Sequence, residues 1–253
     1  MKSKGLNSMK KKVGLSLTAV ALAGSLFSST SMAKENNGNA YGKIGLVGLG
    51  DSITFGYNLG VDNNKPSLYA FPNLIGDEAH LEVSNLGFPG WTTNDLLNAI
   101  KNDKNFQQSI KHANYVTLDI GNNDLLQALK SYNGNPNDLL TILKGTTLPT
   151  IKNNLNQIIL EVSKLTDAPI VLYNIYNPFQ VTDPMHSLAD QLLTTYINPV
   201  IEGIGIQYGV KLADAYVAFG NNQAVYVRVG DIHPTIKGQE VLAKLGEDAL
   251  GLD

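Results

Sequence analysis

The stretch from Lys43 to Gly56 constrains the fold most, because an apolar, glycine-rich run ends there abruptly in a small polar turn. Ile44 to Leu49 is short and uncharged, as expected for a strand buried on both faces of a parallel sheet. Periodicity alone also fits a buried helix, but the length and the glycine content favour a strand. Gly50 permits a sharp turn, so Asp51 and Ser52 are expected beyond the strand's carboxyl end, where open α/β sheets bind ligands.

This turn offers a serine hydroxyl that is a candidate nucleophile. If a helix begins near Ser52, its unpaired N–H groups and the positive end of its dipole favour an oxyanion there. The same residues also fit an ordinary turn with a helix cap, which implies no chemistry. The interpretation of Ser52 therefore depends on partners further along the chain.

The N-terminus has the pattern of a secretory signal peptide. Five lysines precede an apolar run from Val13 to Phe27, and Ser31-Met32-Ala33 then supplies small residues at the expected cleavage positions. We predict a signal peptide over residues 1–33 that is cleaved after Ala33. A membrane anchor is the alternative, but the run is shorter than the ~20 residues that a spanning helix needs. We expect an extracellular protein with no stable membrane anchor after cleavage.

Composition limits the partners of the remaining chain. Without the five lysines of the leader, the chain has 14 basic and 22 acidic residues, a net charge of −8. This charge argues against nucleic acid or an anionic membrane as the main partner.

The chain has no cysteine, so disulfides and a lipidated thiol are excluded. Residues 34–41 are polar and predict a flexible lead-in, and residues 42–253 suit one domain.

Strands and helices are predicted to alternate along this domain, which gives a parallel sheet covered on both faces. We expect strands at 44–49, 81–86, 115–120, 169–175 and 210–215. We expect helices at 65–80, 93–101, 106–112, 124–130, 137–144, 148–165, 187–208 and 235–250. Pro72 must kink the first long helix or lie in its first turn. The fold class is therefore α/β with a five-stranded parallel sheet.

The second and third strands are each followed by a loop that suits oxyanion binding. The second leads into a glycine-rich loop from Asn85 to Thr92, and the third leads into Gly121-Asn122-Asn123-Asp124. A glycine N–H and an asparagine amide, together with the Ser52 N–H, are suitable donors for a three-donor oxyanion hole. Ordinary turn chemistry is the alternative, with Asn123 as a cap of the next helix.

A candidate base precedes the last helix. Gly230-Asp231-Ile232-His233-Pro234 places a histidine beside a carboxylate, on a loop that can reach a serine beyond the first strand. The other histidines have no comparable neighbours and are assigned to the surface or to helix caps: His80, His112 and His186. The alternative for His233 is a loop histidine without a catalytic role.

Four motifs together carry a family resemblance. In order, Gly50-Asp51-Ser52, Gly90, Gly121-x-Asn123-Asp124 and Asp231-x-His233-Pro234 resemble the four sequence blocks of the SGNH (GDSL) hydrolases. The motifs span nearly the whole chain after the leader. The segment 173–179, YNIYNPF, is similar to the corresponding segment of secreted bacterial lipase/acylhydrolase members.

The resemblance implies a flavodoxin-like three-layer α/β/α fold with Ser52 as nucleophile and His233 as base. It implies an oxyanion hole made by the Ser52 N–H, the Gly90 N–H and the Asn123 side chain. One departure matters, because the family's triad aspartate stands three residues before the histidine and that position here is Gly230. We expect Asp231 to orient His233; the alternatives are that the Gly230 carbonyl does so or that Asp231 only caps the last helix.

The expected activity is hydrolysis of carboxylic esters through an acyl-serine, without metal or cofactor. Neither a zinc-binding H-E-x-x-H pair nor a phosphate-binding lysine loop is found, and Ile53 replaces the third glycine of a dinucleotide motif. The G-x-S-x-G elbow of α/β-hydrolases is also absent from the sequence. The alternatives are an O-acetylesterase for carbohydrates with the same mechanism, an inactive binding domain, and a flavin or nucleotide binder on the same sheet.

Two further features bear on the substrate, which the family leaves open between lipid esters, lysophospholipids, thioesters and O-acetylated polysaccharides. The segment 130–148 is either an acyl-chain wall or ordinary core-facing helix; its apolar residues are Tyr132, Leu139, Leu140, Ile142 and Leu143. Trp91, the only tryptophan, directly follows Gly90 and either lines the site or packs in the core.

Overall fold

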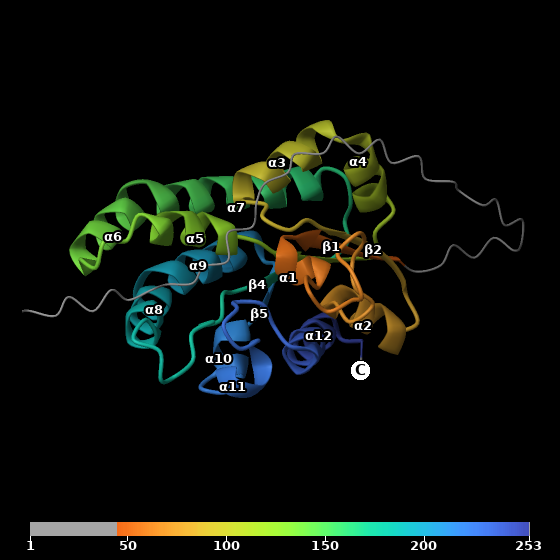
Figure 1. The fold of residues 1–253 in the computed structure, drawn as a ribbon. Helices are drawn as coiled ribbons and strands as arrows, with labels where there is room; N and C mark the ends of the chain where they lie inside the picture. The colour runs from red at the N-terminus through yellow and green to blue at the C-terminus, as the bar shows by residue number, and fades with distance from the viewer. Residues whose placement is uncertain (1–44, 253) are drawn as a thin grey trace, which may run out of the picture. The chain divides into compact units, whose positions relative to one another are not determined.

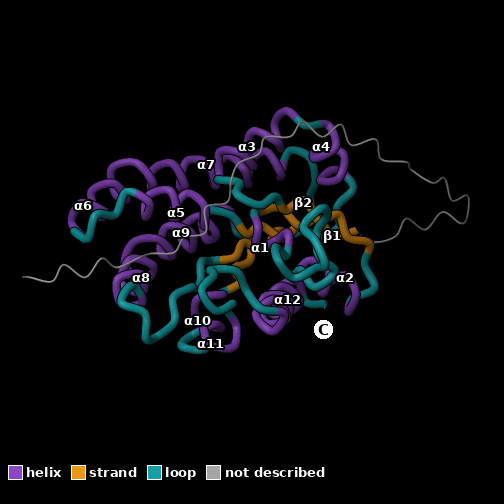
Figure 2. Tube along the Cα trace, viewed as in Figure 1, coloured by secondary structure: helices purple, strands orange, loops and turns teal. Residues whose placement is uncertain are grey.

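The computed structural model describes residues 45–252, and these form an α/β fold around one parallel sheet (Figures 1 and 2). The predicted leader over 1–33 and lead-in over 34–41 lie outside the described residues. The sheet has five strands in the order β2-β1-β3-β4-β5, all parallel, which confirms the predicted α/β class. This is the flavodoxin-like order. The strands are β1 (Gly45–Gly50), β2 (Glu82–Gly87), β3 (Tyr115–Asp119), β4 (Ile170–Tyr173) and β5 (Lys211–Ala213).

Helices cover both faces of the sheet. In Figure 1, α3, α4 and α7 lie above it, while α2, α10, α11 and α12 lie below. The upper layer comprises α3 (Thr93–Asn102), α4 (Lys104–Lys111), α7 (Leu148–Ser163) and α9 (Asn198–Tyr208). The lower layer comprises α2 (Phe71–Glu78), α10 (Ala215–Phe219), α11 (Gln223–Tyr226) and α12 (Ile236–Leu250). The remaining helices are α1 (Ser52–Phe55), α5 (Asn122–Lys130), α6 (Pro136–Ile142) and α8 (His186–Leu192).

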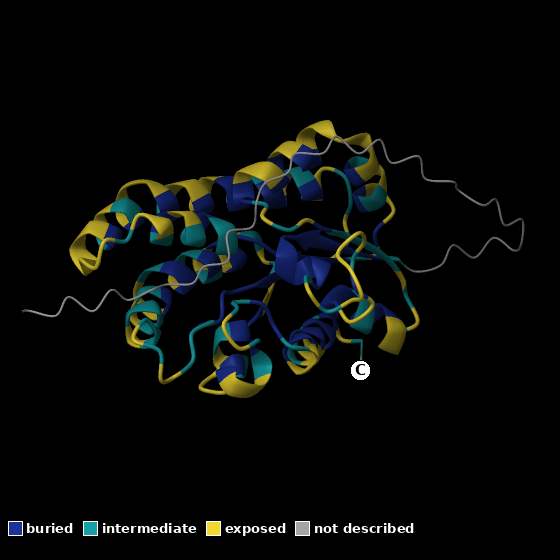
Figure 3. Ribbon diagram, in the orientation of Figure 1, coloured by how far each residue is buried: buried dark blue, intermediate teal, exposed yellow. Residues whose placement is uncertain are grey.

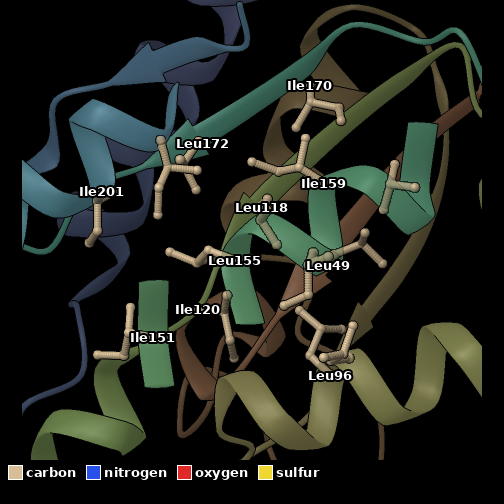
Figure 4. Packing of buried hydrophobic residues seen from close by; sticks show 14 of the residues in the cluster. Leu49, Leu96, Leu118, Ile120, Ile151, Leu155, Ile159, Ile170, Leu172 and Ile201 are labelled. Atoms are coloured by element: carbon tan, nitrogen blue, oxygen red, sulfur yellow. The ribbon is translucent and has the colours of Figure 1, made fainter. Parts of the chain in front are cut away.

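The core has two parts because successive strand residues point to opposite faces. Val47 and Leu49 pack above the sheet, and Leu46 packs below it. Figure 4 shows the upper part, where Leu49 and Leu118 from the strands meet Leu155 of α7. Figure 3 shows buried residues on the strands and exposed residues on the outer sides of the helices. The sheet is therefore buried on both faces, as the uncharged strand 44–49 predicted.

Two glycines of β1, Gly48 and Gly50, serve close packing rather than an unusual backbone conformation. A Cβ at Gly48 would collide with the ring of Pro72 in α2, and a Cβ at Gly50 would collide with the carbonyl oxygen of Asp119. Gly50 is not among the glycines with positive φ. We expected Gly50 to be needed for a sharp turn, but what it provides is space for β3 and α1 against the end of β1.

The helix predicted over 65–80 is shorter than expected. Only Phe71–Glu78 is helical, and Leu68 is 76% exposed rather than part of an apolar face. Pro72 lies in the first turn of α2 and has no N–H to donate to a carbonyl four residues earlier. The helix therefore begins at Phe71, with Pro72 in its first turn, which is one of the two positions expected for this proline. The two short helices α10 and α11 were not predicted.

The segments 136–163 and 186–208 are each one continuous helix with a single wide turn. In the first, π turn η1 (Leu143–Thr147) joins α6 to α7, so the two helices predicted at 137–144 and 148–165 are fused. In the second, π turn η2 (Leu193–Ile197) joins α8 to α9. The Leu148 N–H bonds to the Leu143 carbonyl and the Asn198 N–H to the Leu193 carbonyl, each five residues back.

Each π turn is explained by a proline of its own. Pro149 directly follows Leu148, and Pro199 directly follows Asn198. A proline inside an α-helix has no N–H and its ring clashes with the carbonyl four residues earlier. The wider turn relieves that clash while the helix continues. Such π turns occur often at functional sites. Within residues 45–252, no helix combines the length and apolar character needed to cross a bilayer.

Candidate active site

Ser52 is the first residue of α1 and lies directly beyond the end of β1. The carboxylate of Asp51 caps this short helix by accepting the Ile53 N–H at 2.9 Å. The cap predicted as an alternative role for this turn thus exists, but it is supplied by Asp51 and not by Ser52. The Ser52 Oγ instead lies 3.0 Å from Nε2 of His233.

His233 lies on a tight loop between α11 and α12. An isolated antiparallel bridge between Val227 and Pro234 closes the loop, and Gly230 has a φ of +70°, which glycine adopts readily. Oδ1 of Asp231 lies 2.6 Å from Nδ1 of His233 and also accepts the Ile232 N–H at 2.7 Å. The structure thus brings the carboxylate to the imidazole despite the altered spacing.

Two other roles were possible for this loop, a cap of α12 by Asp231 and orientation of His233 by the Gly230 carbonyl, and neither is observed. The cap of α12 is Thr235, whose hydroxyl accepts the Gly238 N–H at 3.1 Å, so Asp231 does not cap this helix. In residues 45–252, the imidazole Nδ1 has the Asp231 carboxylate as its hydrogen-bond partner, and the Gly230 carbonyl is not among its contacts.

The charge of Asp231 is stabilised where it stands. Its partial burial opposes ionisation, but the hydrogen bond and charge of His233 and the N–H groups of Ile232 and His233 outweigh burial and lower the pKa to about 2. Nε of Arg228 lies 3.5 Å from Asp231 Oδ2, and its Nη1 donates to the Asn58 carbonyl at 2.8 Å. Asp231 therefore remains a carboxylate in any ordinary buffer.

Two tyrosines support the histidine loop. The ring of Tyr57 packs against the imidazole of His233 with centroids 5.1 Å apart. The hydroxyl of Tyr176, just beyond β4, donates to the Ile232 carbonyl at 2.8 Å. The loop is thus held from two elements distant in the sequence, which fixes the position of the imidazole relative to Ser52.

The two predicted oxyanion loops meet beside the end of β1. Phe88 N–H donates to the Gly50 carbonyl at 3.1 Å, which places the loop that contains Gly90 next to the serine turn. Asn123, in the first turn of α5, donates through Nδ2 to the Trp91 carbonyl at 2.9 Å. Asn123 is therefore tied to the residue that follows Gly90, and the three-donor oxyanion hole stays a prediction.

The alternatives for these loops are partly resolved. The N-cap of α5 is Gly121, with no side-chain cap, so Asn123 does not cap the helix. Trp91 stacks on Phe88 with centroids 4.3 Å apart and also contacts Phe106. Trp91 therefore packs in an aromatic cluster. Of its two expected roles, this is packing in the core rather than lining the site.

Asp124 connects the Gly90 loop and the Asn123 loop through hydrogen bonds. It accepts the Thr93 N–H at 2.8 Å and the Thr93 hydroxyl at 2.7 Å, and Asn154 of α7 donates to that hydroxyl at 3.0 Å. Burial raises the pKa of Asp124, and the bonds from Thr93 oppose this rise. The network joins the start of α3 to the start of α5, which are the helices that follow the Gly90 and Asn123 loops.

Two buried carboxyls, Asp51 and Asp119, lie at the ends of β1 and β3. Burial raises the pKa of Asp51 to about 6, and burial together with the charge of Asp51 raises the pKa of Asp119 well above its usual range. The Asn122 amide is 3.2 Å from Asp51 and 3.5 Å from Asp119, so it bridges the two. Each of the two carboxyls therefore keeps its proton to a higher pH than an ordinary surface carboxyl does.

Sequence reasoning missed three residues that shape the site: Tyr57, Asn122 and Arg228. Arg228 is the only arginine of the chain and stands three residues before Asp231, a signal available in the sequence. The bridge by Asn122 and the packing of Tyr57 join elements that only the fold brings together. Across residues 45–252, no three histidine, aspartate or glutamate side chains gather where they could hold a metal ion.

Known proteins resemble the chain in sequence and fold. It is 25% identical over 201 residues to the spore germination lipase LipC of Bacillus licheniformis, across 78% of this chain and 91% of that relative. The lipase Lip_vut3 from a goat rumen metagenome has a TM-score of 0.66 at 22% identity, covering 82% of this chain and 97% of that one. A catalytic mutant of Axe2, an acetylxylan esterase from Geobacillus stearothermophilus, has a TM-score of 0.59 at 20% identity, covering 84% and 95%.

At these identities the two solved structures establish the fold alone, which is that of the SGNH hydrolases. The sequence match to a family model is more specific and extends over residues 49–241, from the end of β1 into α12. It includes every motif from the serine turn to the histidine loop. Because this match covers more than half of the sequence, the chain belongs to the GDSL-like lipase/acylhydrolase family.

Proposed function

We propose that this protein hydrolyses carboxylic esters through an acyl-enzyme intermediate on Ser52. The observation that carries the proposal is a continuous chain of contacts, 3.0 Å from Ser52 Oγ to His233 Nε2 and 2.6 Å from His233 Nδ1 to Asp231. Both distances are within the range needed for proton transfer and for orientation of the base. A nucleophile, a base and an orienting carboxylate in this relation are the requirements for serine catalysis.

In the first step, His233 removes the Ser52 proton as Oγ attacks the ester carbonyl. Asp231 accepts the Nδ1 proton of His233 in a hydrogen bond, so Nε2 is the nitrogen free to act as the base. The negative charge on the substrate oxygen is stabilised by donors from the Ser52 N–H, the Gly90 N–H and the Asn123 amide. His233 then gives its proton to the leaving alcohol.

In the second step, His233 takes a proton from water, and the resulting hydroxide attacks the acyl-serine. The same oxyanion donors stabilise the second tetrahedral intermediate, and the proton returns to Ser52 as the acid leaves. Every proton passes through one imidazole. The Asp231 carboxylate balances the positive charge that the imidazole carries in each step.

A carbohydrate O-acetylesterase is the second candidate, because the mechanism is identical and one similar structure is described as an acetylxylan esterase. An inactive binding domain is a third interpretation, against which the intact contacts from Ser52 to Asp231 argue. These candidates differ in observable activity and in the acyl group removed.

The test is hydrolysis of p-nitrophenyl esters by residues 34–253 and by its Ser52→Ala and His233→Ala variants. We expect each variant to lose at least ~10⁴-fold in kcat, the scale on which removal of a triad member acts in serine hydrolases. The matched controls are Ser163→Ala and His112→Ala, which alter exposed residues at the ends of α7 and α4.

A serine-reactive phosphonate supplies a readout that does not depend on the choice of ester. Labelling of the wild type at Ser52, together with no labelling of Ser52→Ala, supports an active nucleophile. A folded wild type that cleaves no ester from acetyl to palmitoyl and takes no label at Ser52 overturns the proposal and favours a binding domain.

A further inference from the structure

An apolar cavity begins beside the serine turn. About 90 Å³ inside it is open to a water-sized molecule, and its total empty space, with the solvent at its open mouth included, is about 710 Å³. Three of the residues that line it are Ile53, Asn122 and Ile232. These are the immediate sequence neighbours of the nucleophile, the asparagine donor and the base of the proposed reaction. The cavity therefore adjoins the proposed catalytic residues.

The chemistry of the wall suits hydrocarbon and not sugar. No lining side chain carries a charge. The polar groups of Asn122 and Tyr176 already have partners in the protein, since the amide bonds to Asp51 and the hydroxyl bonds to the Ile232 carbonyl. A carbohydrate would leave its hydroxyls without partners along such a wall, and an unpaired buried hydroxyl is costly.

The cavity is much longer than an acetyl group. Asn122, Leu125, Leu126 and Leu129 all line it and are spaced as one face of α5. At 1.5 Å of rise per residue, this face extends about 10 Å from Asn122 to Leu129. An elongated apolar slot that begins at Ile53, the residue after the nucleophile, fits an unbranched chain lying along α5.

The two π turns form a further part of the wall. Leu143 and Leu193, the first residues of η1 and η2, both line the cavity and are 2% and 4% exposed. The turns contact each other, because Nζ of Lys144 in η1 lies 4.3 Å from the ring centroid of Tyr196 in η2. The proline-dependent wide turns thus place one leucine from each long helix at the same slot.

We propose that this cavity holds the acyl chain of the substrate, so that the enzyme selects esters of an unbranched hydrocarbon chain far longer than acetyl. The inference rests on the proposed function, because it places the acyl group of the Ser52 intermediate in the cavity. Of the two roles expected for the segment 130–148, it assigns Leu139 and Leu143 to the acyl-chain wall.

The first test is the dependence of kcat/KM on the length of the acyl chain. Each methylene that enters the cavity contributes about 0.8 kcal/mol, which corresponds to a rise of about fourfold in kcat/KM. We expect this rise from acetyl through butanoyl to octanoyl p-nitrophenyl esters, followed by a plateau once the chain exceeds the slot.

The second test obstructs the cavity. Ala189→Phe adds a ring to a lining residue of α8, and Ser187→Phe adds the same ring to an exposed, non-lining residue of the same helix. We expect Ala189→Phe to lower kcat/KM for the octanoyl ester at least tenfold and to leave the acetyl ester within twofold. Met185→Trp, at the lining residue before α8, is a second obstruction in case the first variant does not fold.

The third test measures binding without catalysis. The fluorescent fatty acid cis-parinaric acid is titrated into Ser52→Ala, which keeps the cavity but cannot form an acyl-enzyme. We expect saturable binding that Ala189→Phe weakens at least tenfold in the Ser52→Ala background and that Ser187→Phe leaves unchanged.

The outcomes separate the two proposals. Activity confined to the acetyl ester, with no fatty-acid binding, overturns the acyl cavity and leaves ester hydrolysis intact. Fatty-acid binding that Ala189→Phe weakens, without hydrolysis of any ester, supports the cavity and overturns the catalytic proposal. Equal losses on acetyl and octanoyl esters in both obstructed variants overturn the assignment of the cavity to the acyl chain.

Discussion

Oδ1 of Asp231 lies 2.6 Å from Nδ1 of His233 although only one residue separates them in the sequence. The contact depends on the sharp loop at Gly230, in which the same carboxylate oxygen also accepts the Ile232 N–H. One oxygen thus shapes the loop and holds the imidazole. The shorter spacing therefore still allows Asp231 to orient the base.

Replacing Asp231 by asparagine tests this orientation. An amide can present its N–H₂ group to the imidazole and favour the tautomer in which Nε2 carries the proton, so we expect kcat to fall about 10⁴-fold. The measurement is ester hydrolysis at saturating substrate, with Glu240→Gln on the exposed side of α12 as the control. A loss of tenfold or less would remove Asp231 from the mechanism.

Arg228 is expected to act as a positioning residue through Asp231 and the Asn58 carbonyl. Arg228→Met removes both contacts, and we expect a roughly tenfold fall in kcat with KM within twofold, because small displacements of a base slow catalysis. Loss of a nearby positive charge also makes the imidazole easier to protonate, so the acidic limb of kcat/KM moves to higher pH.

Arg228→Lys is the matched variant for that experiment. It keeps the charge but loses the planar group that reaches two partners, so we expect its pH profile to follow the wild type while kcat falls partway. A pH profile that is the same in all three proteins, or a change in KM alone, contradicts a positioning role.

The buried pair of carboxyls at the ends of β1 and β3 predicts an unusual pH dependence of stability. The folded-state pKa of Asp51 is about 6 and that of Asp119 is also raised, so above pH 4 the folded state binds more protons than the unfolded state. The free energy of unfolding should therefore decrease as pH rises from about 4 through these pKa values. The stabilising contribution is complete only below the unfolded pKa.

Asp119→Asn should remove part of this penalty. The amide keeps an oxygen for Asn122 but carries no charge, so we expect a gain on the order of 1 kcal/mol in the free energy of unfolding at pH 8. Urea unfolding at pH 4 and pH 8 measures it, with Asp77→Asn on the exposed surface of α2 as the control. A variant less stable than wild type at pH 8 would show that the charge is favourable there.

The leader predicts where the chain begins after export. We propose that secretion removes residues 1–33, so the intact mass of protein from the culture medium should correspond to residues 34–253. Ala33→Phe places a large ring at the small-residue position and should block cleavage, whereas Ala40→Phe should not. A secreted protein that retains residues 1–33 contradicts the predicted site.

By itself the sequence determined the order and type of most elements, because strand and helix patterns are local. The sequence also identified the residues of the proposed mechanism. They lie in the serine turn, the two donor loops and the histidine loop. The order of the strands and helices sets which edge of the sheet these loops reach. The helix predicted over 65–80 begins only at Phe71, because Pro72 occupies its first turn, which was one of the two positions expected for it.

Only the tertiary structure decided how these parts cooperate. Arg228 meets Asn58 across 170 residues, and Lys144 meets Tyr196 across the two π turns. The acyl cavity likewise needs α5 and both long helices to be packed together before it exists. Such contacts depend on how side chains from distant segments fill a shared space, and no local periodicity encodes that packing.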